Sequence, residues 1–531
     1  MNETKKTIDK KNIILIIIGI IVIIAMVICF VIALINHKTN NTSTSTSTYQ
    51  TGYAITKGGS YDIEDDQTCI VIKTTEDVTL NLNNANITCS NGPAINVEEA
   101  DEVTINLNGE NTITSTTTEA LDGAIYSKSD LILSGDGSLN VTSNYDGIVS
   151  KDDLIIESGT YTIKSDDDGI RGKDSVEITN GTFNINAGGD GIKSTNEEDT
   201  TKGYINITDG VFTINSSNDG IQAETNLNIK TGTFDIETTG SINSDSDSYK
   251  GLKAGTLITI NDGTYNIDSV DDSIHSNGNI IINNGEYTIN TKDDGLHADD
   301  TLTINNGTIN IENCNEGFEG SKIYIKGGNN TINASDDGIN AASSDSTETN
   351  NKVRDNFKNS TGVLEISGGT TKVVSAGDGL DSNGTITISG GNTYVESSNS
   401  GPEEAIDNVG EMNITGGTLI TVSKNMANDD GTKTSSVPYL NTSVNNGSGK
   451  ITIGNITYTP TISGYKYIFI ASSNLTTGTD TLNYGNESTS VTITTGTISN
   501  IGGNQMGGPG NQGGPGEQNP GGQYPGGPGR R

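Results

Sequence analysis

Short stretches in which apolar and polar residues alternate recur along most of the chain, and they predict β-strands. In 168–189, apolar residues stand at Ile170, at the pair Val176 and Ile178, and at the pair Phe183 and Ile185. A spacing of two places both side chains of a pair on the same face of a strand. Apolar or aromatic residues occupy the same positions in the stretches that begin at Asp146, Lys250, Asp272 and Asp294.

A signature of Asp, Gly and an apolar residue gives the period of this pattern. Its first residue, or the residue that replaces it, stands at Asp122, Asp146, Asp168, Asp190, Asp219, Lys250, Asp272, Asp294, Glu316, Asp337 and Asp378. In the numbering of the chain, the successive steps are 24, 22, 22, 29, 31, 22, 22, 22, 21 and 41. A recurring step of about 22 residues with occasional insertions indicates a solenoid.

Glycines at a fixed position predict a corner in each coil. The thirteenth position after the signature is a glycine in five coils, at Gly159, Gly181, Gly263, Gly285 and Gly307. A hairpin turn is the alternative, but the flanking runs are short, and a corner with positive φ explains the glycine better. We therefore predict an all-β fold, a right-handed parallel β-helix with coils of about 22 residues. Residues 55–430 would form about 15 coils, roughly 70 Å long.

The two ends of the chain differ from this repeat. Residues 13–35 are an unbroken apolar run, long enough to span a membrane as a helix. Four lysines precede it, which predicts a cytoplasmic segment 1–12 and an extracellular remainder; a cleaved signal peptide is the alternative. The other predicted segments are a Ser/Thr-rich stalk at 36–54, a small antiparallel β unit at 431–501 that covers the last coil, and a disordered Gly/Pro/Gln-rich tail at 502–531.

Charge and cysteine content narrow the choice of partner. The formal net charge is −37, and nucleic-acid binding needs clustered lysines and arginines, so we do not expect nucleic acid as a partner. Cys69, Cys89 and Cys314 lie outside the apolar run. A bridge between Cys69 and Cys89 across adjacent turns and three buried thiols are both compatible with the spacing.

Several stretches resemble a known family. They are Asn91-Gly92-Pro93-Ala94-Ile95, Gly109-Glu110-Asn111-Thr112 and the repeated Asp-Asp-Gly-Ile. Together they resemble prokaryotic cell-surface carbohydrate-binding domains that fold as right-handed parallel β-helices. The resemblance covers about 55–500 and implies calcium bound by aspartates of the coils, recognition of plant-type polysaccharides such as pectin or cellulose, and an architecture akin to pectate lyases. Lys250 and Ser273 depart from the pattern and leave gaps in the acidic column.

Because the period matches the coil, the signature aspartates should stack, with a second acidic column beside them. Each aspartate alone is explained by capping a backbone N–H at its corner, with glycine allowing a left-handed conformation. For the paired columns we favour Ca²⁺, because like charges about 5 Å apart repel and oxygen ligands suit this ion. Outward-facing aspartates would require a kink at Gly169 and its equivalents. The predicted metal ligands are Asp167, Asp168, Asp190, Asp271, Asp272, Asp293, Asp294, Asp336, Asp337 and Asp378.

A mixed polar column follows three residues after each signature position. It supplies the predicted glycan-binding residues, which are Arg171, Lys193, Lys253, His275 and His297. The two histidines are a weak transition-metal signal without a third type of ligand. A calcium-dependent polysaccharide lyase would use Arg171, Lys193 or Lys253 as its base, and nothing marks one of them.

These observations predict a membrane-anchored, extracellular protein that binds polysaccharide through a calcium-bearing face and is not an enzyme. The chain has no tryptophan, and Tyr161, Tyr265 and Tyr287 stand at inward positions, which favours charged or hydroxyl-rich glycans over crystalline cellulose. A surface adhesin or structural rod without glycan specificity is the first alternative, and the lyase is the second.

Overall fold

The computed structural model describes residues 52–116, 123–241, 248–342, 361–398, 403–425 and 431–499. Within these ranges the secondary structure consists of β-strands, which confirms the all-β prediction. None of the described residues belongs to a helix that is long and apolar enough to cross a membrane. The apolar run 13–35, most of the stalk and the tail 502–531 lie outside the described residues.

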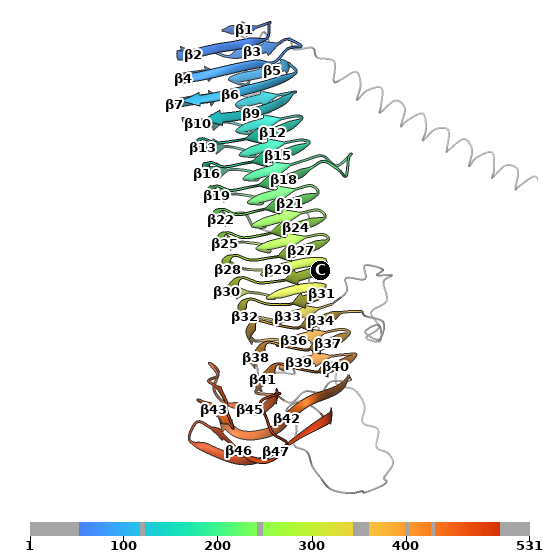
Figure 1. Ribbon diagram of the computed structural model, residues 1–531. Helices are drawn as coiled ribbons and strands as arrows, with labels where there is room; N and C mark the ends of the chain where they lie inside the picture. The colour runs from blue at the N-terminus through green and yellow to red at the C-terminus, as the bar shows by residue number, and fades with distance from the viewer. Residues whose placement is uncertain are drawn as a thin grey trace, which may run out of the picture. The chain divides into compact units, whose positions relative to one another are not determined.

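Most strands fall into three columns, which we name A, B and C in the order in which the chain visits them (Figure 1). Column A contains β1 (Tyr53–Ile55), β3 (Ile70–Lys73), β5 (Ile95–Glu99), β8 (Ile125–Ser127), β11 (Ile148–Ser150), β14 (Ile170–Gly172), β17 (Ile192–Ser194), β20 (Ile221–Ala223), β23 (Leu252–Ala254), β26 (Ile274–Ser276), β33 (Ile339–Ala341), β36 (Leu380–Ser382) and β39 (Ile406–Asn408). Column B contains β6 (Glu102–Asn108), β9 (Asp130–Gly135), β12 (Asp153–Ile156), β15 (Ser175–Ile178), β18 (Tyr204–Ile207), β21 (Asn226–Ile229), β24 (Leu257–Ile260), β27 (Asn279–Ile282), β34 (Val363–Ile366), β37 (Thr385–Ile388) and β40 (Glu411–Ile414).

Column C contains β7 (Glu110–Ser115), β10 (Ser138–Ser143), β13 (Thr160–Ser165), β16 (Thr182–Ala187), β19 (Val211–Ser216), β22 (Thr233–Thr238), β25 (Thr264–Ser269), β28 (Glu286–Thr291), β30 (Thr308–Cys314), β32 (Asn329–Ala334), β35 (Thr370–Ser375), β38 (Asn392–Ser397) and β41 (Thr418–Ser423). Four longer strands run through two columns. They are β2 (Gly59–Gln67) and β4 (Val78–Cys89) in columns B and C, and β29 (Leu296–Ile304) and β31 (Phe318–Ile325) in columns A and B.

Within each column, a strand pairs in parallel with the equivalent strand of the next coil. Ile148 of β11 is opposite Ile170 of β14, and Tyr161 of β13 is opposite Phe183 of β16, so partners lie one period of the sequence repeat apart. The repeat read from the sequence is therefore the stacking period of the structure.

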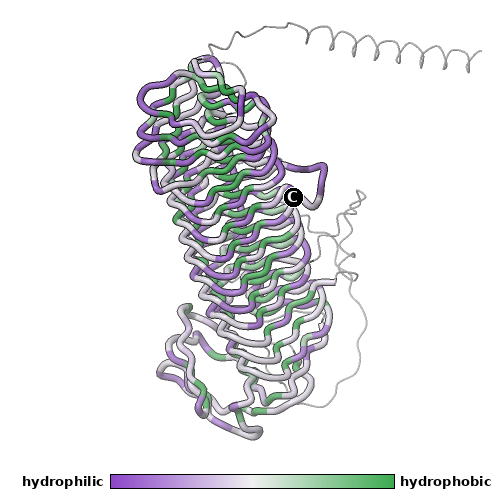
Figure 2. Tube along the Cα trace, turned by 45° about the horizontal axis from the view of Figure 1, so that its top comes forward, coloured by the Kyte–Doolittle hydropathy of each residue, from purple (hydrophilic) through white to green (hydrophobic). Residues whose placement is uncertain are grey.

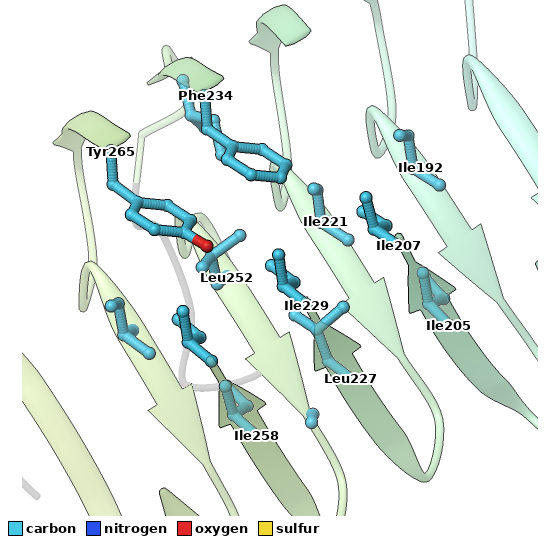
Figure 3. Close-up of a cluster of buried hydrophobic side chains, with 14 of the residues drawn as sticks. Ile192, Ile205, Ile207, Ile221, Leu227, Ile229, Phe234, Leu252, Ile258 and Tyr265 are labelled. Atoms are coloured by element: carbon cyan, nitrogen blue, oxygen red, sulfur yellow. The ribbon is translucent and has the colours of Figure 1, made fainter. Parts of the chain in front are cut away.

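The apolar positions of the repeat form the interior. Hydrophobic positions line up from coil to coil in Figure 2, and Figure 3 shows side chains from all three columns, such as Ile221, Leu227 and Phe234, turned toward one another. Column C adds a stack of rings whose centroids lie 4.7 to 5.0 Å apart. The stack consists of Tyr161, Phe183, Phe212, Phe234, Tyr265 and Tyr287. The inward position predicted for its three tyrosines is confirmed, since each is at most 2% exposed.

The corner before column C is the one predicted from its glycines. Gly159, Gly181, Gly263, Gly285 and Gly307 have φ angles of 119°, 148°, 128°, 125° and 116°. Residues with a Cβ rarely adopt such φ angles. Glycine therefore lets the chain turn into each strand of column C that carries a stacked ring.

Antiparallel strands follow the last coil. They are β42 (Thr432–Gly447), β43 (Ile451–Ile453), β44 (Ile456–Tyr458), β45 (Tyr465–Ser472), β46 (Gly478–Tyr484) and β47 (Glu487–Ile498). Strand β45 pairs antiparallel with β41, which is the last strand of column C, and β42 extends column B by pairing in parallel with β40. These two strands thereby pair with the last strands of columns B and C.

The cysteines near the start of the solenoid form a disulfide. Cys69 and Cys89 are bonded to each other, and Cys314 is buried as a free thiol. Of the two arrangements that the sequence left open, the bridge between adjacent turns is the one formed.

Candidate functional site

The signature aspartates lie at the turn between columns C and A, and we call Asp146, Asp168, Asp190, Asp219, Asp272, Asp294, Asp337 and Asp378 the acidic ladder. Except for Asp337, each is at most 9% exposed. The Oδ1 atom accepts a hydrogen bond from the backbone N–H of the next coil: Asp168 donates to Asp146 at 3.0 Å, and Asp190 donates to Asp168 at 2.8 Å. The same bond joins Asp294 to Asp272 at 3.1 Å and Glu316 to Asp294 at 3.0 Å.

These bonds correct two details of the sequence analysis. Each aspartate caps the backbone of the following coil, whereas the sequence suggested that it caps its own corner. Its side chain runs along the stack and does not project into solvent. The glycine that follows is not needed for a left-handed conformation, because Gly169 has an ordinary φ. It is needed for close approach, since a Cβ there would lie 2.5 Å from the carbonyl oxygen of Gly191.

The close approach predicts a stability effect. The change Gly169→Ala should lower the free energy of unfolding by about 1–3 kcal/mol, because the backbone must shift to relieve the overlap. Urea unfolding would measure it, with Thr162→Ala as control, since Thr162 is exposed on β13. Equal stability of Gly169→Ala and the parent protein would contradict the tight stacking of this turn.

The second carboxylate oxygen of several ladder aspartates meets a cation. Arg171 pairs with Asp146 and Lys193 with Asp190, and Lys253 lies 3.3 Å from Asp219. The structure therefore brings three of the predicted glycan-binding residues onto the predicted acidic column. These side chains are about one-quarter exposed, so one side of each cation still faces solvent.

Lys250 does not leave a gap in the ladder as the sequence suggested. Its backbone N–H donates to Asp219 at 2.7 Å, and its Nζ lies 2.8 Å from Asp271 and 2.9 Å from Asp272. The lysine thus places a positive charge between carboxylates of the next coil. Burial opposes ionisation of Asp272, but the hydrogen bond with His275, the nearby imidazole of His297 and the charge of Lys250 outweigh it and lower its pKa.

From the coil of Glu316 onward, the acidic groups outnumber the described cations. Within the residues that the structure describes, none of Asp337, Asp378 and Asp381 forms an ion pair with a lysine, arginine or histidine. Burial, followed by nearby carboxylates, raises the pKa of Glu316 to about 8 and that of Asp381 to about 8. Burial likewise raises the pKa of Asp378 to about 7 and that of Asp337 to about 6.

An amide oxygen in the same region lacks a donor. Asn340 pairs in register with Asp381 on the neighbouring strand, and its Nδ2 donates to Glu316 at 2.9 Å. Its Oδ1 atom is buried without a hydrogen-bond partner. A buried acceptor beside carboxylates with raised pKa values is the arrangement that a bound cation would satisfy.

The two histidines are stacked neighbours, as their spacing in the repeat predicted. His275 and His297 pair in register, and their ring centroids are 4.7 Å apart. The sequence showed no further ligand type beside the histidines, but the structure places carboxylates there. Nδ1 of His297 lies 3.6 Å from Asp272, 3.5 Å from Asp294 and 3.2 Å from Glu319. Burial opposes a charged imidazole, but these carboxylates outweigh it and raise the pKa of His297 to about 11.

A comparison with known protein families identifies the family of this chain. Residues 49–295 and 291–505 each match the family described as carbohydrate-binding domain-containing proteins. The chain belongs to this family. The resemblance stated from the sequence is thereby confirmed, and the description names carbohydrate binding and no reaction. No curated protein matches this carbohydrate-binding chain.

One similar solved structure is the polysaccharide lyase-like protein from C. thermocellum, in its gadolinium derivative. It is 31% identical to this carbohydrate-binding chain, and the match covers 35% of this chain and 80% of that protein. The TM-score is 0.33.

The remaining predicted ligands of the carbohydrate-binding chain fall into two groups. Asp167 and Asp168 lie with Asp146, and Asp293 lies with Asp271 and Asp272; in each group, one oxygen per residue lies within 4.8 Å of the others. Asp336 is exposed beside Asp337. These are distances between side chains, and binding of metal or glycan by them stays a prediction.

A third acidic group was missed by the sequence reasoning. Asp130, Asp152 and Asp153 meet at the turn between columns A and B, on the far side of column A from the ladder. Burial and a hydrogen bond shared with Asp174 raise the pKa of Asp152 to about 6. The signal was present, because Asp130, Asp152 and Asp174 recur with the same period as the ladder.

Proposed function

We propose that this protein binds an acidic, uronate-containing polysaccharide through calcium ions held by the C-terminal part of the acidic ladder. Family membership supports binding of carbohydrate in general. The observation that carries the proposal is the set of carboxylates at Asp337, Asp378 and Asp381, of which Asp378 is buried and the other two are partly buried, together with the unpartnered Oδ1 of Asn340.

The ladder itself supplies the argument for an external ion. In its N-terminal part, Arg171, Lys193 and Lys250 bring positive charge to the carboxylates. At its C-terminal part, none of the described residues brings a positive charge to Asp337 and Asp378 of the ladder or to the neighbouring Asp381, and a divalent cation would do what a lysine does elsewhere. Calcium accepts six to eight oxygen ligands, so protein oxygens at this site would leave positions for a sugar carboxylate.

The cations along the N-terminal part of the ladder would contact the same polysaccharide. Arg171, Lys193 and Lys253 form one outward line in β14, β17 and β23, in register with His275 and His297. A polymer of uronates could follow this line, with its carboxylates near the solvent-facing sides of the cations. Interspersed hydroxyl groups would find hydrogen-bond partners at Gln222 and Asn340.

We further propose that the coils wind as a right-handed parallel β-helix, anchored in the membrane by residues 13–35 with the bulk outside the cell. The hand follows the general preference of parallel crossovers. The Cys69–Cys89 disulfide supports an oxidising, extracellular location, since such bonds are rare in the cytosol.

Retention on immobilised polygalacturonate tests this function. The full chain, kept in detergent, should be retained with calcium, released by a chelator, and not retained on an uncharged glucan. Asp381→Asn should weaken retention about tenfold or more if its carboxylate binds calcium. Asp268→Asn is the matched control, because Asp268 is exposed on column C, away from the ladder.

Retention that is independent of calcium would contradict the bridging ion. Binding to neither polymer by a folded chain would move the adhesin or structural rod to first place.

A further inference from the structure

The imidazole of His297 faces more acceptors than its protons can serve. Asp272, Asp294 and Glu319 belong to three successive coils, and an oxygen of each lies 3.2 to 3.6 Å from the same atom, Nδ1 of His297. A hydrogen on Nδ1 can point to one of these oxygens at a time. Three acceptors around one nitrogen therefore suggest a ligand sphere.

The separations fit a metal better than hydrogen bonds. Charge-assisted N–H···O bonds measure about 2.7–2.9 Å. Zinc binds imidazole nitrogen and carboxylate oxygen at about 2.0–2.2 Å, and the edges of a tetrahedron with arms of that length are about 3.3–3.6 Å. The distances from Nδ1 to Asp294 and Glu319 are 3.5 and 3.2 Å, close to those edges.

The surroundings of the histidine resemble the outer shell of a metal ligand. Its second nitrogen, Nε2, lies 3.4 Å from Oδ1 of Asp299. A metal-bound histidine commonly directs its other N–H to a carboxylate, which fixes the tautomer and leaves the first nitrogen free to coordinate. His275 is placed differently, because its Nδ1 already forms a 2.8 Å hydrogen bond with Asp272 and its Nε2 a 3.0 Å bond with Asn277.

We propose that Asp294, His297 and Glu319 form a binding site for a divalent transition-metal ion of the zinc class, distinct from the calcium sites proposed above. One ligand atom from each residue lies within 4.8 Å of the others. The imidazole selects zinc over calcium, which prefers oxygen ligands. Three protein ligands leave a fourth position, which Asp272 or a solvent-side ligand would complete. The ion would join the coils of β29 and β31.

Titration calorimetry with Zn²⁺ alone, on the full chain in detergent, tests the site, and Co²⁺ reports imidazole coordination by its visible spectrum. The parent protein should bind one Zn²⁺ that calcium does not displace. His297→Ala should weaken binding at least about tenfold, and Glu319→Gln should do the same. Glu319 is one-quarter exposed, so its variant keeps the test valid if His297→Ala fails to fold.

His275→Gln is the matched control, because it removes the neighbouring imidazole and leaves the three ligands in place. It should retain zinc affinity within about tenfold. No zinc binding by the parent, unchanged binding by both ligand variants, or selective loss with His275→Gln would overturn the assignment. Calcium-dependent retention on polygalacturonate should persist in Glu319→Gln, because Glu319 belongs to neither the glycan-binding line nor the calcium ligands proposed above. Failure of the zinc site is therefore distinguishable from failure of the proposed function.

Discussion

Without divalent cations, the C-terminal coils should lose stability as the pH rises from about 4 to about 8. Glu316, Asp337, Asp378 and Asp381 have raised pKa values of about 8, 6, 7 and 8. Each group therefore holds a proton in the folded chain at pH values at which the unfolded chain has released it. A folded state that binds more protons loses stability as the pH increases.

The sign is opposite to that of an ordinary salt-bridged aspartate. A carboxyl group whose pKa is lowered by folding stabilises the protein at pH values above its pKa in the unfolded chain. These groups have raised pKa values, so they destabilise the folded chain once the pH forces them to ionise. The four groups are mostly buried and interact, so their combined cost is on the order of 5 kcal/mol rather than a sum of independent shifts. For a chain of this length, that corresponds to a fall in Tm of about 5 °C.

Calcium should remove most of this pH dependence. An ion that binds only the folded chain adds about 2.7 kcal/mol at 100 times its Kd, and it binds best when the carboxylates are ionised. Hydrogen exchange measured at pH 5 and pH 8, in chelator and in calcium, would locate the effect in β33, β36 and β39. The internal control is β26, beside Asp272, whose pKa is lowered.

Two results would count against this account. Protection of β33, β36 and β39 that increases with pH in chelator would mean that these carboxylates do not resist ionisation. A loss with pH that calcium leaves unchanged would mean that they resist ionisation but do not bind the ion.

The periodic features of the fold could be predicted because each repeats once per coil. Pairs such as Val176 and Ile178 mark strands, and the step between signature residues marks their stacking. Gly181 was assigned to a corner with positive φ, and its φ is 148°. Gly169 could not be assigned correctly, because its role is to let another coil's backbone approach, and that contact lies between residues far apart in sequence.

The sequence predicted which residues belong to the candidate site, but it did not predict which atoms of these residues contact one another. Spacing placed His275 beside His297 and Lys193 three residues after Asp190, but it could not show which oxygen caps a backbone N–H and which meets a cation. Lys250 looked like a defect in an acidic column, although its charge lies between two carboxylates of the next coil. The balance of charge along the ladder depends on such contacts and on burial.

Replacing this lysine tests whether a cation of the chain and a bound ion are interchangeable. Lys250→Met keeps the apolar stem and removes the charge that lies 2.8 Å from Asp271 and 2.9 Å from Asp272. Because its side chain is only 13% exposed, Asp271 and Asp272 would both lose a largely buried positive charge, and only Asp272 would keep its contact with His275. The free energy of unfolding in chelator at pH 8 should fall by about 3–5 kcal/mol.

Calcium should then restore much of that loss, because Asp271, Asp272 and Asp293 keep oxygens within 4.8 Å of one another. Lys322→Met is the matched control: Lys322 pairs with Asp300 at 3.1 Å, but both side chains are about half exposed, so its loss should cost less than about 1 kcal/mol. Urea unfolding of the three proteins, with and without calcium, gives the comparison. If calcium raises the free energy of unfolding of Lys250→Met more than that of the other two proteins, the ladder binds cations wherever no lysine or arginine of the chain pairs with it. A variant that loses stability without that gain would restrict the ladder to capping the backbone of the stacked coils.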